Sequence, residues 1–439
     1  MAKRVVIKGA SIYTKEGVVR ADVALAEGRI SAVEPTIEPT EADEVVELNG
    51  ATLFSGFVDL HVHLREPGFS RKETIATGTA AAARGGVTTL FTMPNLSPVP
   101  DTVEHIGQQL DIIKQDAVVN VIPYASITMG QKGAGELVDF EALAPLCGGF
   151  SDDGRGVQSD ELMEQAMVEA KRVDRPIVAH CEVDALLRKG YIHDGEYARL
   201  NGHRGICSES EWAQVERDLK IVERVGCQYH VCHISTKETV DLIRQYKAKG
   251  CRVSCETAAH YLILTDMDLK EEGRFKMNPP IRSAEDRAAL IEGIVDGTID
   301  VIATDHAPHT AEEKSRGLEK SAFGVVGIEF SFAAMYHNFV RTGIISLDRL
   351  VELMSSRARE LFGLERVAIE VGSVADLVAI DLTESYKIDP EEFVSMGKAT
   401  PLEGREVTGR VLATWVGGEG RGASSLLALA CLYELSKTE

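Results

Sequence analysis

Two histidines, His61 and His63, end an apolar run that begins at Phe57. In a β-strand, residues two apart point to the same side, so the two imidazoles can bind one metal ion as a pair. A His-x-His pair is also found among packed and surface histidines. Its meaning here depends on the residues that end the later apolar runs.

Further metal-binding residue types end later apolar runs in the same way. They are Asp152, Asp153, His180, His233 and Asp305. Imidazole and carboxylate ligands of this kind suit Zn²⁺ with positions left open for water. Strand alternation allows only one of His230 and His233 to face the site, and favours His233 at the strand end. It does not choose between Asp152 and Asp153.

A set of this size exceeds the needs of one tetrahedral ion and suits two ions that share a bridging carboxylate. Such a pair lowers the pKa of a bridging water toward neutrality, which gives hydroxide, and polarises a carbonyl oxygen. Asp305, at the end of the last run, can take a proton from that nucleophile and pass it to a leaving nitrogen. The chemistry indicated is hydrolysis of an amide-like bond, or its reverse.

The apolar runs that carry these residues alternate with segments of helical period. The expected strands are 53–63, 87–93, 118–126, 147–152, 176–181, 228–234, 251–257 and 299–304. The expected helices include 72–84, 158–173, 208–225, 236–249 and 283–296. Apolar strands that alternate with helices predict an α/β fold, a (β/α)₈ TIM barrel, with its active site at the C-terminal ends of the strands.

Both ends of the chain show short strand patterns, over 4–52 and again at 374–380 and 409–416. We expect them to pair into one small β-sandwich domain. The predicted organisation is therefore 1–52 and 362–418 for the sandwich and 53–361 for the barrel. Helices are expected at 325–340 and 346–361, and 419–439 stays unassigned.

Composition limits the classes of function. The 439 residues carry a net charge of −21, which argues against binding to nucleic acid or to an anionic membrane. The sequence has no long apolar run and no secretory pattern, so a cytoplasmic protein is expected. Its eight cysteines are then free thiols. A zinc site built from Cys251, Cys255 and their neighbours Cys227 and Cys232 is the alternative, although all four lie in strand-like runs.

Four motifs resemble the signatures of the dihydroorotase family, in its long bacterial type, within the amidohydrolase superfamily. They are His61-Val62-His63-Leu64-Arg65-Glu66-Pro67-Gly68, Thr92-Met93-Pro94-Asn95, Asn278-Pro279-Pro280-Ile281-Arg282 and Ala303-Thr304-Asp305-His306-Ala307-Pro308-His309. The resemblance covers residues 1–418 and implies reversible cyclisation of N-carbamoyl-L-aspartate to L-dihydroorotate in pyrimidine synthesis. It also implies a homodimer and association with an aspartate transcarbamoylase.

The resemblance assigns roles residue by residue. Two Zn²⁺ ions per subunit are implied, the first bound by His61, His63 and Asp305 and the second by His180 and His233. Asp153 is implied as the bridge, in place of the carboxylated lysine of many superfamily members. The substrate-binding residues implied are Arg65, Asn95 and His309 for the substrate carboxylate and Asn278 for the ring amide.

Some features leave alternatives open. Where the family usually has Thr-Pro-His-His, this chain has Ala258-Ala259-His260-Tyr261, which leaves the shape of that loop undecided. The polar segment 310–317 is either a mobile lid or a plain solvated loop. An allantoinase or dihydropyrimidinase is the nearest alternative enzyme, against which the absent lysine and Arg65 argue. A catalytically inactive homologue that acts as a scaffold for a transcarbamoylase is also disfavoured. Such proteins typically lose metal ligands, and none is missing here.

Overall fold

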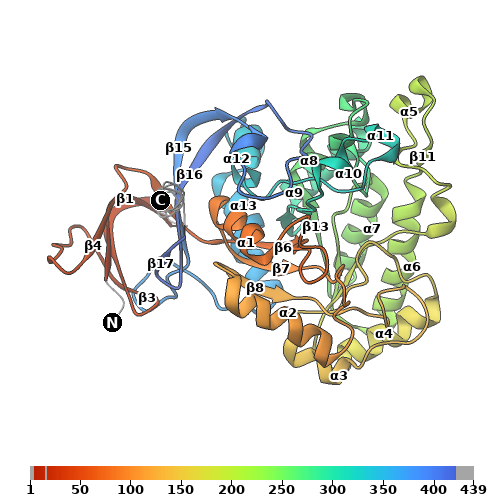
Figure 1. Cartoon of the computed structure of the whole chain (residues 1–439), viewed down its shortest axis with the longest axis horizontal. Coiled ribbons are helices and arrows are strands. Elements are labelled where there is room, and N and C mark those ends of the chain that lie inside the picture. Colours follow the sequence, from red (N-terminus) through yellow and green to blue (C-terminus); the bar gives the residue numbers. More distant parts are fainter. Residues whose placement is uncertain (1–3, 15–16, 422–439) are drawn as a thin grey trace, which may run out of the picture.

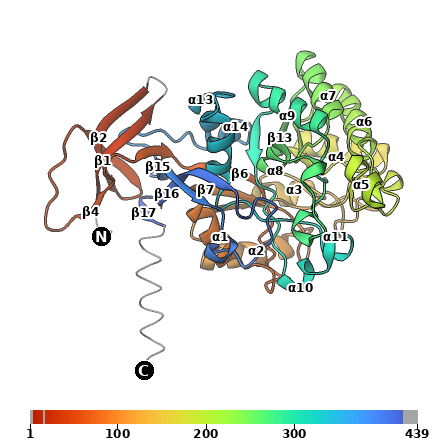
Figure 2. The same cartoon turned by 90° about the horizontal axis from the view of Figure 1, so that it is seen from above.

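The computed structural model describes residues 4–14 and 17–421 and contains two structural regions. A β-sheet built from both ends of the chain lies at one side, and a larger barrel with surrounding helices lies at the other (Figure 1). Viewed from above, the long strands β15 (Leu377–Lys387) and β16 (Glu406–Val416) run between the two (Figure 2).

Seven short parallel strands form most of the barrel, in one group of three and one of four. They are β6 (Phe57–Val62), β7 (Val87–Thr92), β8 (Asn120–Pro123), β9 (Ile177–Ala179), β12 (Tyr229–Val231), β13 (Val253–Ala258) and β14 (Val301–Ala303). Their order, β6-β7-β8 and β9-β12-β13-β14, follows the sequence. This is the parallel arrangement expected from apolar strands that alternate with helices.

Isolated bridges close the two groups into a ring. Phe150 pairs with Ala125 after β8 and with Ile177 in β9, and so fills the fourth strand position. On the other side Val62 pairs with His306, and the backbone N–H of His63 donates to the His306 carbonyl at 2.9 Å. The eightfold order predicted from the sequence is therefore present, although the expected strand at 147–152 is reduced to bridging contacts at Phe150.

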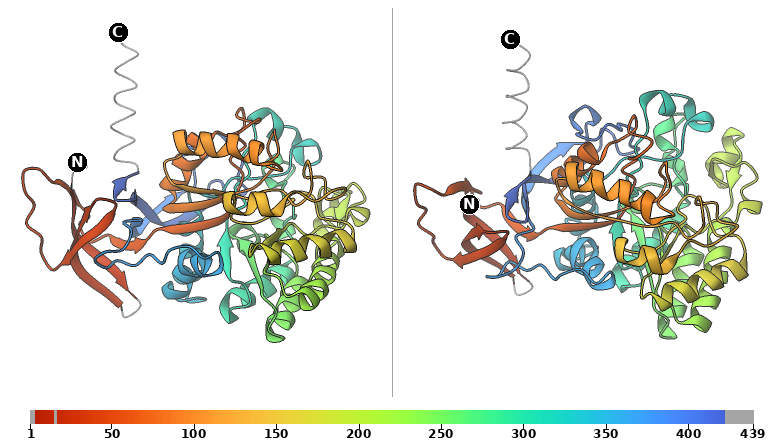
Figure 3. Two further views of the ribbon diagram at one scale, coloured as in Figure 1. Left: turned by 90° about the horizontal axis from the view of Figure 1, so that it is seen from below. Right: turned by 60° about the horizontal axis from the view of Figure 1, so that its bottom comes forward.

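Helices cover the outside of the barrel (Figure 3). The longer ones are α1 (Ile75–Arg84), α2 (Val103–Asp116), α4 (Asp160–Arg172), α6 (Glu209–Val225), α7 (Lys237–Ala248) and α9 (Ala284–Asp296). Short ones are α3 (Phe140–Leu143), α5 (Glu196–Asn201), α8 (Ala259–Ile263), α10 (Ala311–Lys314), α11 (Gly317–Lys320), α12 (Ser331–Met335), α13 (Leu347–Val351) and α14 (Arg357–Leu361). The five helices expected between the barrel strands are all present, with ends shifted by a few residues.

Helix α1 shows why the sequence folds as it does locally. Thr74 caps its first turn by accepting a hydrogen bond from the backbone N–H of Thr77. Apart from Ile75, its buried residues are small, and the helix ends at Gly85. A Cβ on Gly85 would lie 2.0 Å from the Ile328 carbonyl oxygen, so only glycine permits this approach. The Thr414 hydroxyl of β16 donates to the Ala83 carbonyl at 2.7 Å and joins α1 to the terminal sheet.

The terminal sheet contains strands from both chain ends. Its order is β17-β16-β15-β5-β1-β2-β3, with β4 beside β1. The strands not yet placed are β1 (Val5–Thr14), β2 (Gly17–Ala26), β3 (Arg29–Glu34), β4 (Glu44–Glu47), β5 (Thr52–Ser55) and β17 (Glu419–Gly420). The predicted pairing of the two ends is observed, in one eight-stranded sheet. Its division into the two layers of a sandwich stays a prediction.

Two further expectations need correction. The strand predicted at 53–63 is two strands, because the chain leaves β5 in the terminal sheet, turns at Gly56 and enters β6 of the barrel. A Cβ on Gly56 would lie 2.2 Å from the Thr88 side chain, which is why the crossing takes glycine. The unassigned tail from residue 419 begins with β17, and residues 422–439 lie outside the described part of the chain.

The segment expected to be a lid or a solvated loop is folded into α10 and α11. Lys314, at the end of α10, is buried, and its ammonium donates to the backbone carbonyls of Lys276, Ala322 and Gly324 at 3.0, 2.8 and 2.6 Å. A plain solvated loop is therefore excluded. A lid motion stays a prediction.

Candidate metal centre and substrate site

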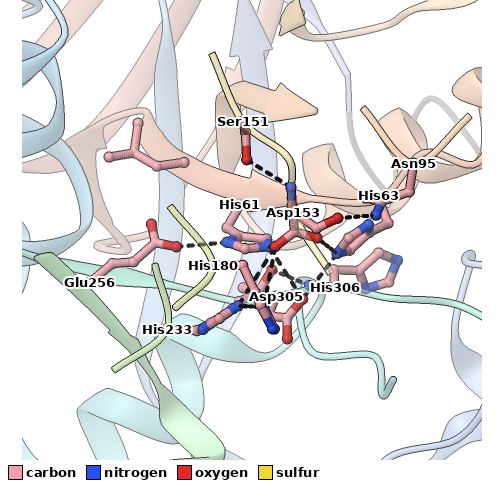
Figure 4. A network of polar contacts seen from close by, with 12 residues as sticks. His61, His63, Asn95, Ser151, Asp153, His180, His233, Glu256, Asp305 and His306 are labelled. Carbon is pink, nitrogen blue, oxygen red and sulfur yellow. Dashed lines mark hydrogen bonds and ion pairs between the residues drawn. The ribbon is translucent and has the colours of Figure 1, made fainter. Parts of the chain in front are cut away.

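The metal-binding residue types gather at the C-terminal ends of the barrel strands (Figure 4). His61 lies on β6, His180 directly follows β9, His233 follows β12 and Asp305 follows β14. Asp153 comes three residues after the Phe150 bridge. The structure thus brings these positions together at one mouth, and their role as metal ligands stays a prediction.

One group of ligand atoms is formed by His61, His63 and Asp305, whose ligand atoms all lie within 4.8 Å of one another. The nearer Asp305 oxygen is 3.1 Å from His63 Nε2 and 3.5 Å from His61 Nε2. All three side chains are buried. Two imidazoles and a carboxylate that face the same point form a ligand set for a divalent ion.

A second group surrounds Asp153. Its Oδ1 atom lies 3.4 Å from His61 Nε2, 3.6 Å from His233 Nε2 and 3.7 Å from His180 Nδ1. The other oxygen lies 3.6 Å from His63 Nε2. The Asp153 carboxylate thus contacts both histidine pairs, which is the position that a bridging ligand requires.

The structure separates the two adjacent aspartates that strand alternation left undecided. The Asp152 carboxylate accepts hydrogen bonds from the backbone N–H groups of Ile127, Thr128 and Gly133 at 2.8 to 3.1 Å. It also accepts from the Thr128 hydroxyl at 2.5 Å. Asp152 therefore holds the 127–133 loop, whereas Asp153 faces the histidines.

Several buried polar atoms at this mouth have no hydrogen-bond partner among the described residues. They are His61 Nε2, His63 Nδ1, Asp153 Oδ1, His180 Nε2 and His233 Nδ1. Buried polar atoms are rarely left without a partner unless an ion or ligand satisfies them. The cluster of nitrogen and carboxylate donors thus fits a metal site.

Backbone conformation contributes to the arrangement. Arg65, His233 and Asp305 have positive φ values of 61°, 32° and 45°. Such conformations are unfavourable for residues other than glycine and concentrate at functional sites. The strained backbone at these three positions directs their side chains toward the mouth of the barrel.

The carboxyl groups of the site are ionised at neutral pH. Burial raises the pKa of Asp305, but its hydrogen bond with His63 and the nearby His61 outweigh burial and hold the pKa well below its ordinary value. Burial also raises the pKa of Asp153, and His61 and His233 more than reverse this effect. Each group can therefore bind a cation, and Asp305 can accept a proton.

Arg65 and His309 form a second cluster beside the metal-binding residues. Arg65 Nη2 lies 3.3 Å from His309 Nε2, and Arg65 Nε donates to the Pro308 carbonyl at 3.2 Å. Burial lowers the pKa of Arg65 to about 10, so its guanidinium stays charged at neutral pH. Burial, together with Arg65 and Lys72, lowers the pKa of His309 to about 3, so its ring is neutral. A fixed cation beside the metal-binding residues suits an anionic substrate.

Asn95 and Asn278 contact different parts of this site. Asn95 Nδ2 donates to the Asp153 carbonyl at 2.7 Å, and its amide oxygen is buried without a partner among the described residues. Asn278 Nδ2 donates to Glu182 Oε2 at 2.7 Å, and the other Glu182 oxygen lies 3.8 Å from His180 Nε2. All four residues predicted to bind substrate are therefore near the metal-binding cluster or in contact with it.

Comparison with known proteins gives a consistent result. A family described as "Dihydro-orotase-like" matches residues 50–239. A dihydroorotase from Geobacillus sp. (strain WCH70) is 47% identical over 418 residues, which cover 94% of this chain and 98% of that protein. A dihydroorotase from Fusobacterium nucleatum subsp. nucleatum is 47% identical, with 94% and 97% covered. The chain belongs to the dihydroorotase family.

The solved structures agree with this fold. The L-hydantoinase (dihydropyrimidinase) from Arthrobacter aurescens is similar with a TM-score of 0.83 and 27% identity, and the match covers 95% of this chain and 96% of that one. This member of the dihydroorotase family thus has the overall architecture of a cyclic-amide hydrolase. Among its described residues, no helix has both the length and the apolar character needed to cross a membrane.

The sequence reasoning missed Glu256, which lies on β13 and contacts His61. Burial raises the pKa of Glu256, but His230 and His61 lower it to about 2. A glutamate inside an apolar strand was the available signal, since an acidic side chain is rarely fully buried unless it is paired. His230, the histidine that strand alternation disfavoured as a ligand, contacts Glu256 at 3.2 Å and packs against Phe362, which directly follows α14.

The loop where this chain departs from the family pattern begins α8. His260 is buried there, burial lowers its pKa to about 4, and its Nε2 has no partner among the described residues. The Tyr261 hydroxyl donates to the Pro279 carbonyl at 2.7 Å. The expected free thiols are also observed: all seven cysteines of the described chain are free, and only Cys232 among them lies within a group of metal-competent atoms.

Proposed function

We propose that this chain catalyses the reversible interconversion of L-dihydroorotate and N-carbamoyl-L-aspartate in pyrimidine biosynthesis. The observation that carries the proposal is 47% identity to proteins named dihydroorotase over 94% of the chain. The convergence of His61, His63, Asp153, His180, His233 and Asp305 at one mouth supports it.

The metal centre is proposed to hold two Zn²⁺ ions per subunit. His61, His63 and Asp305 would bind one ion, His180 and His233 the other, and Asp153 both. When bound, two such ions supply an activated water nucleophile and polarise the substrate carbonyl. The contacts of Asp153 with both histidine pairs support the bridging role. Many superfamily members bridge the two ions with a carboxylated lysine. Lys171, one of the lysines nearest to Asp153 in the sequence, donates to the Val225 carbonyl and is not available for this role.

Asp305 is proposed as the general base and acid. In the hydrolytic direction its carboxylate accepts a proton as the nucleophilic oxygen forms a bond to the amide carbonyl carbon. The ring C–N bond then breaks, and Asp305 delivers the same proton to the departing nitrogen. The ionised state of the Asp305 carboxyl at neutral pH and its position beside His63 are compatible with this assignment.

Arg65, Asn95 and His309 are proposed to bind the substrate carboxylate, and Asn278 to bind the ring amide. A guanidinium presents two parallel donors that match a carboxylate. The charge of the half-buried Arg65 beside the mouth supports this role, and it favours dihydroorotate over uncharged cyclic amides such as hydantoin.

The proposal includes a cytoplasmic homodimer that associates with an aspartate transcarbamoylase, and the division into domains at residues 52, 361 and 418. Size-exclusion chromatography with light scattering, alone and with the transcarbamoylase, tests the assembly.

Chelation tests the activity. The purified protein should convert carbamoyl aspartate and dihydroorotate into each other, lose this activity on exhaustive chelation and regain it with Zn²⁺. Activity that survives removal of all bound metal would contradict the proposed centre.

A further inference from the structure

Glu256 is a fully buried carboxylate placed between two imidazole rings. One oxygen lies 2.8 Å from Nδ1 of His61 (Figure 4). The other lies 3.2 Å from Nε2 of His230. The chain of contacts continues, since His230 Nδ1 lies 2.8 Å from the Ser254 hydroxyl. A polar chain therefore extends from the metal-binding cluster into the barrel interior.

The surroundings of Glu256 make its presence costly. Every residue of β13 is buried, and the strand neighbours of Glu256 are Cys255 and Thr257. An ionised carboxylate in such a place is stable only when it is paired and hydrogen-bonded. Each of its oxygens has one imidazole partner, so the rings and the carboxylate depend on one another.

The contacts determine which nitrogen of the neutral His61 ring carries the proton. An ionised carboxylate only accepts hydrogen bonds, so Nδ1 of His61 must be a protonated nitrogen. In the neutral ring, which is the form that binds a metal ion, Nε2 then carries the lone pair. That atom points to Asp153 and Asp305, at 3.4 and 3.5 Å, and has no hydrogen-bond partner among the described residues. This is the tautomer in which His61 can bind a metal ion through Nε2.

We propose that Glu256 is the positioning residue of the metal centre: it holds His61 in the Nδ1–H tautomer and in the orientation that directs Nε2 at the ion. A carboxylate behind a metal-binding imidazole also increases the basicity of that ligand. The partners of the Glu256 carboxylate are the rings of His61 and His230, so it acts on the metal centre through His61. The inference rests on the proposed metal centre.

The zinc affinity of the metal-free protein, measured by competition with a chelating dye, tests the role. Glu256→Gln keeps the size of the side chain but removes the charge, and it should weaken zinc binding by about 10- to 100-fold. Ser254→Ala is the matched control: it removes the far end of the same polar chain without touching His61, and zinc affinity should stay at the wild-type value. Equal affinities for wild type and Glu256→Gln would overturn the inference.

A second measurement needs no folded variant at position 256. In ¹⁵N-histidine NMR spectra of the metal-free wild-type protein, recorded at a pH high enough for the His61 ring to be neutral, the His61 signal, assigned by its loss in His61→Asn, should show the Nδ1–H tautomer. A Nε2–H tautomer would overturn the inference. The two proposals fail separately: a wild-type protein that binds no zinc contradicts the proposed function, whereas tight zinc binding with the Nε2–H tautomer contradicts only the role of Glu256.

Discussion

The Asp305 carboxylate lies 3.1 Å from Nε2 of His63, although the two residues are 242 positions apart in the sequence. The barrel brings them together because β14 and β6 are neighbours, joined by the bridge between His306 and Val62. Asp305, which follows the last barrel strand, therefore lies beside His61 and His63 at the end of the first barrel strand. The proposed proton carrier is fixed beside the proposed ligands by the closure of the ring.

Asp305→Asn should lower kcat by about 10²- to 10⁴-fold, because the amide keeps the shape but cannot accept the proton. The pKa of Asp305 lies below its ordinary value, so the wild-type base is ionised at neutral pH and loses activity only as acid protonates it. The hydrolytic pH profile of the variant should therefore lack this acidic limb. Near-normal kcat with an unchanged profile would move the proton transfer to another group, and His309 and His260 would be tested next.

Asp153→Ala should lose bound metal, because Asp153 contacts both histidine pairs. Elemental analysis of the purified variant measures this loss directly. Activity of the wild type should not depend on bicarbonate, since no lysine carbamate has to form.

Asp152→Ala, which changes the adjacent aspartate, is the control for Asp153→Ala. It should keep its metal, whereas its free energy of unfolding should fall by at least about 1–3 kcal/mol, because it leaves buried N–H groups of the 127–133 loop without an acceptor. The opposite pattern, with metal lost only from the Asp152 variant, would show that the bridge was assigned to the wrong aspartate.

Arg65→Met should raise the KM for dihydroorotate while metal content stays unchanged. A hydrogen bond to a charged group contributes about 1.5–3 kcal/mol, which corresponds to roughly 10- to 150-fold in KM. Steady-state kinetics with metal analysis of the same sample checks both parts. Wild-type KM in the variant would leave Arg65 only its observed contacts with Pro308 and His309.

Lys314→Met should loosen the segment that contains α10 and α11, because three backbone carbonyls lose their buried donor. Limited proteolysis should then cut within 311–322 faster than in the wild type. Lys320→Met changes an exposed lysine of the same segment and serves as the control. Equal cleavage rates in all three proteins would mean that Lys314 does not hold this segment.

Much of this site was predictable because strand ends are visible in the sequence. His61, His180, His233 and Asp305 each follow an apolar run, and parallel strands of a barrel bring such ends together. Strand alternation could not choose Asp153 over Asp152, although the family resemblance implied Asp153, because the choice depends on the turn after Phe150 and on the loop N–H groups that bind Asp152.

Other features depend on contacts between distant residues, which sequence patterns do not encode. Apolar residues flank Gly56 on both sides, so the sequence pattern continues across the passage from the terminal sheet to the barrel. Glu256 could be noticed as an acidic residue in an apolar strand, but its partner His61 lies 195 positions away. The burial of Lys314 likewise follows from carbonyls on another segment.

The central claim is the activity itself, and the specificity constant for L-dihydroorotate tests it most directly. The zinc-loaded protein should be assayed on L-dihydroorotate, hydantoin, dihydrouracil and allantoin under identical conditions. We predict that kcat/KM for dihydroorotate exceeds that for each uncharged cyclic amide, and that Arg65→Met removes most of this preference. Turnover of dihydrouracil or allantoin with none of dihydroorotate would contradict the account.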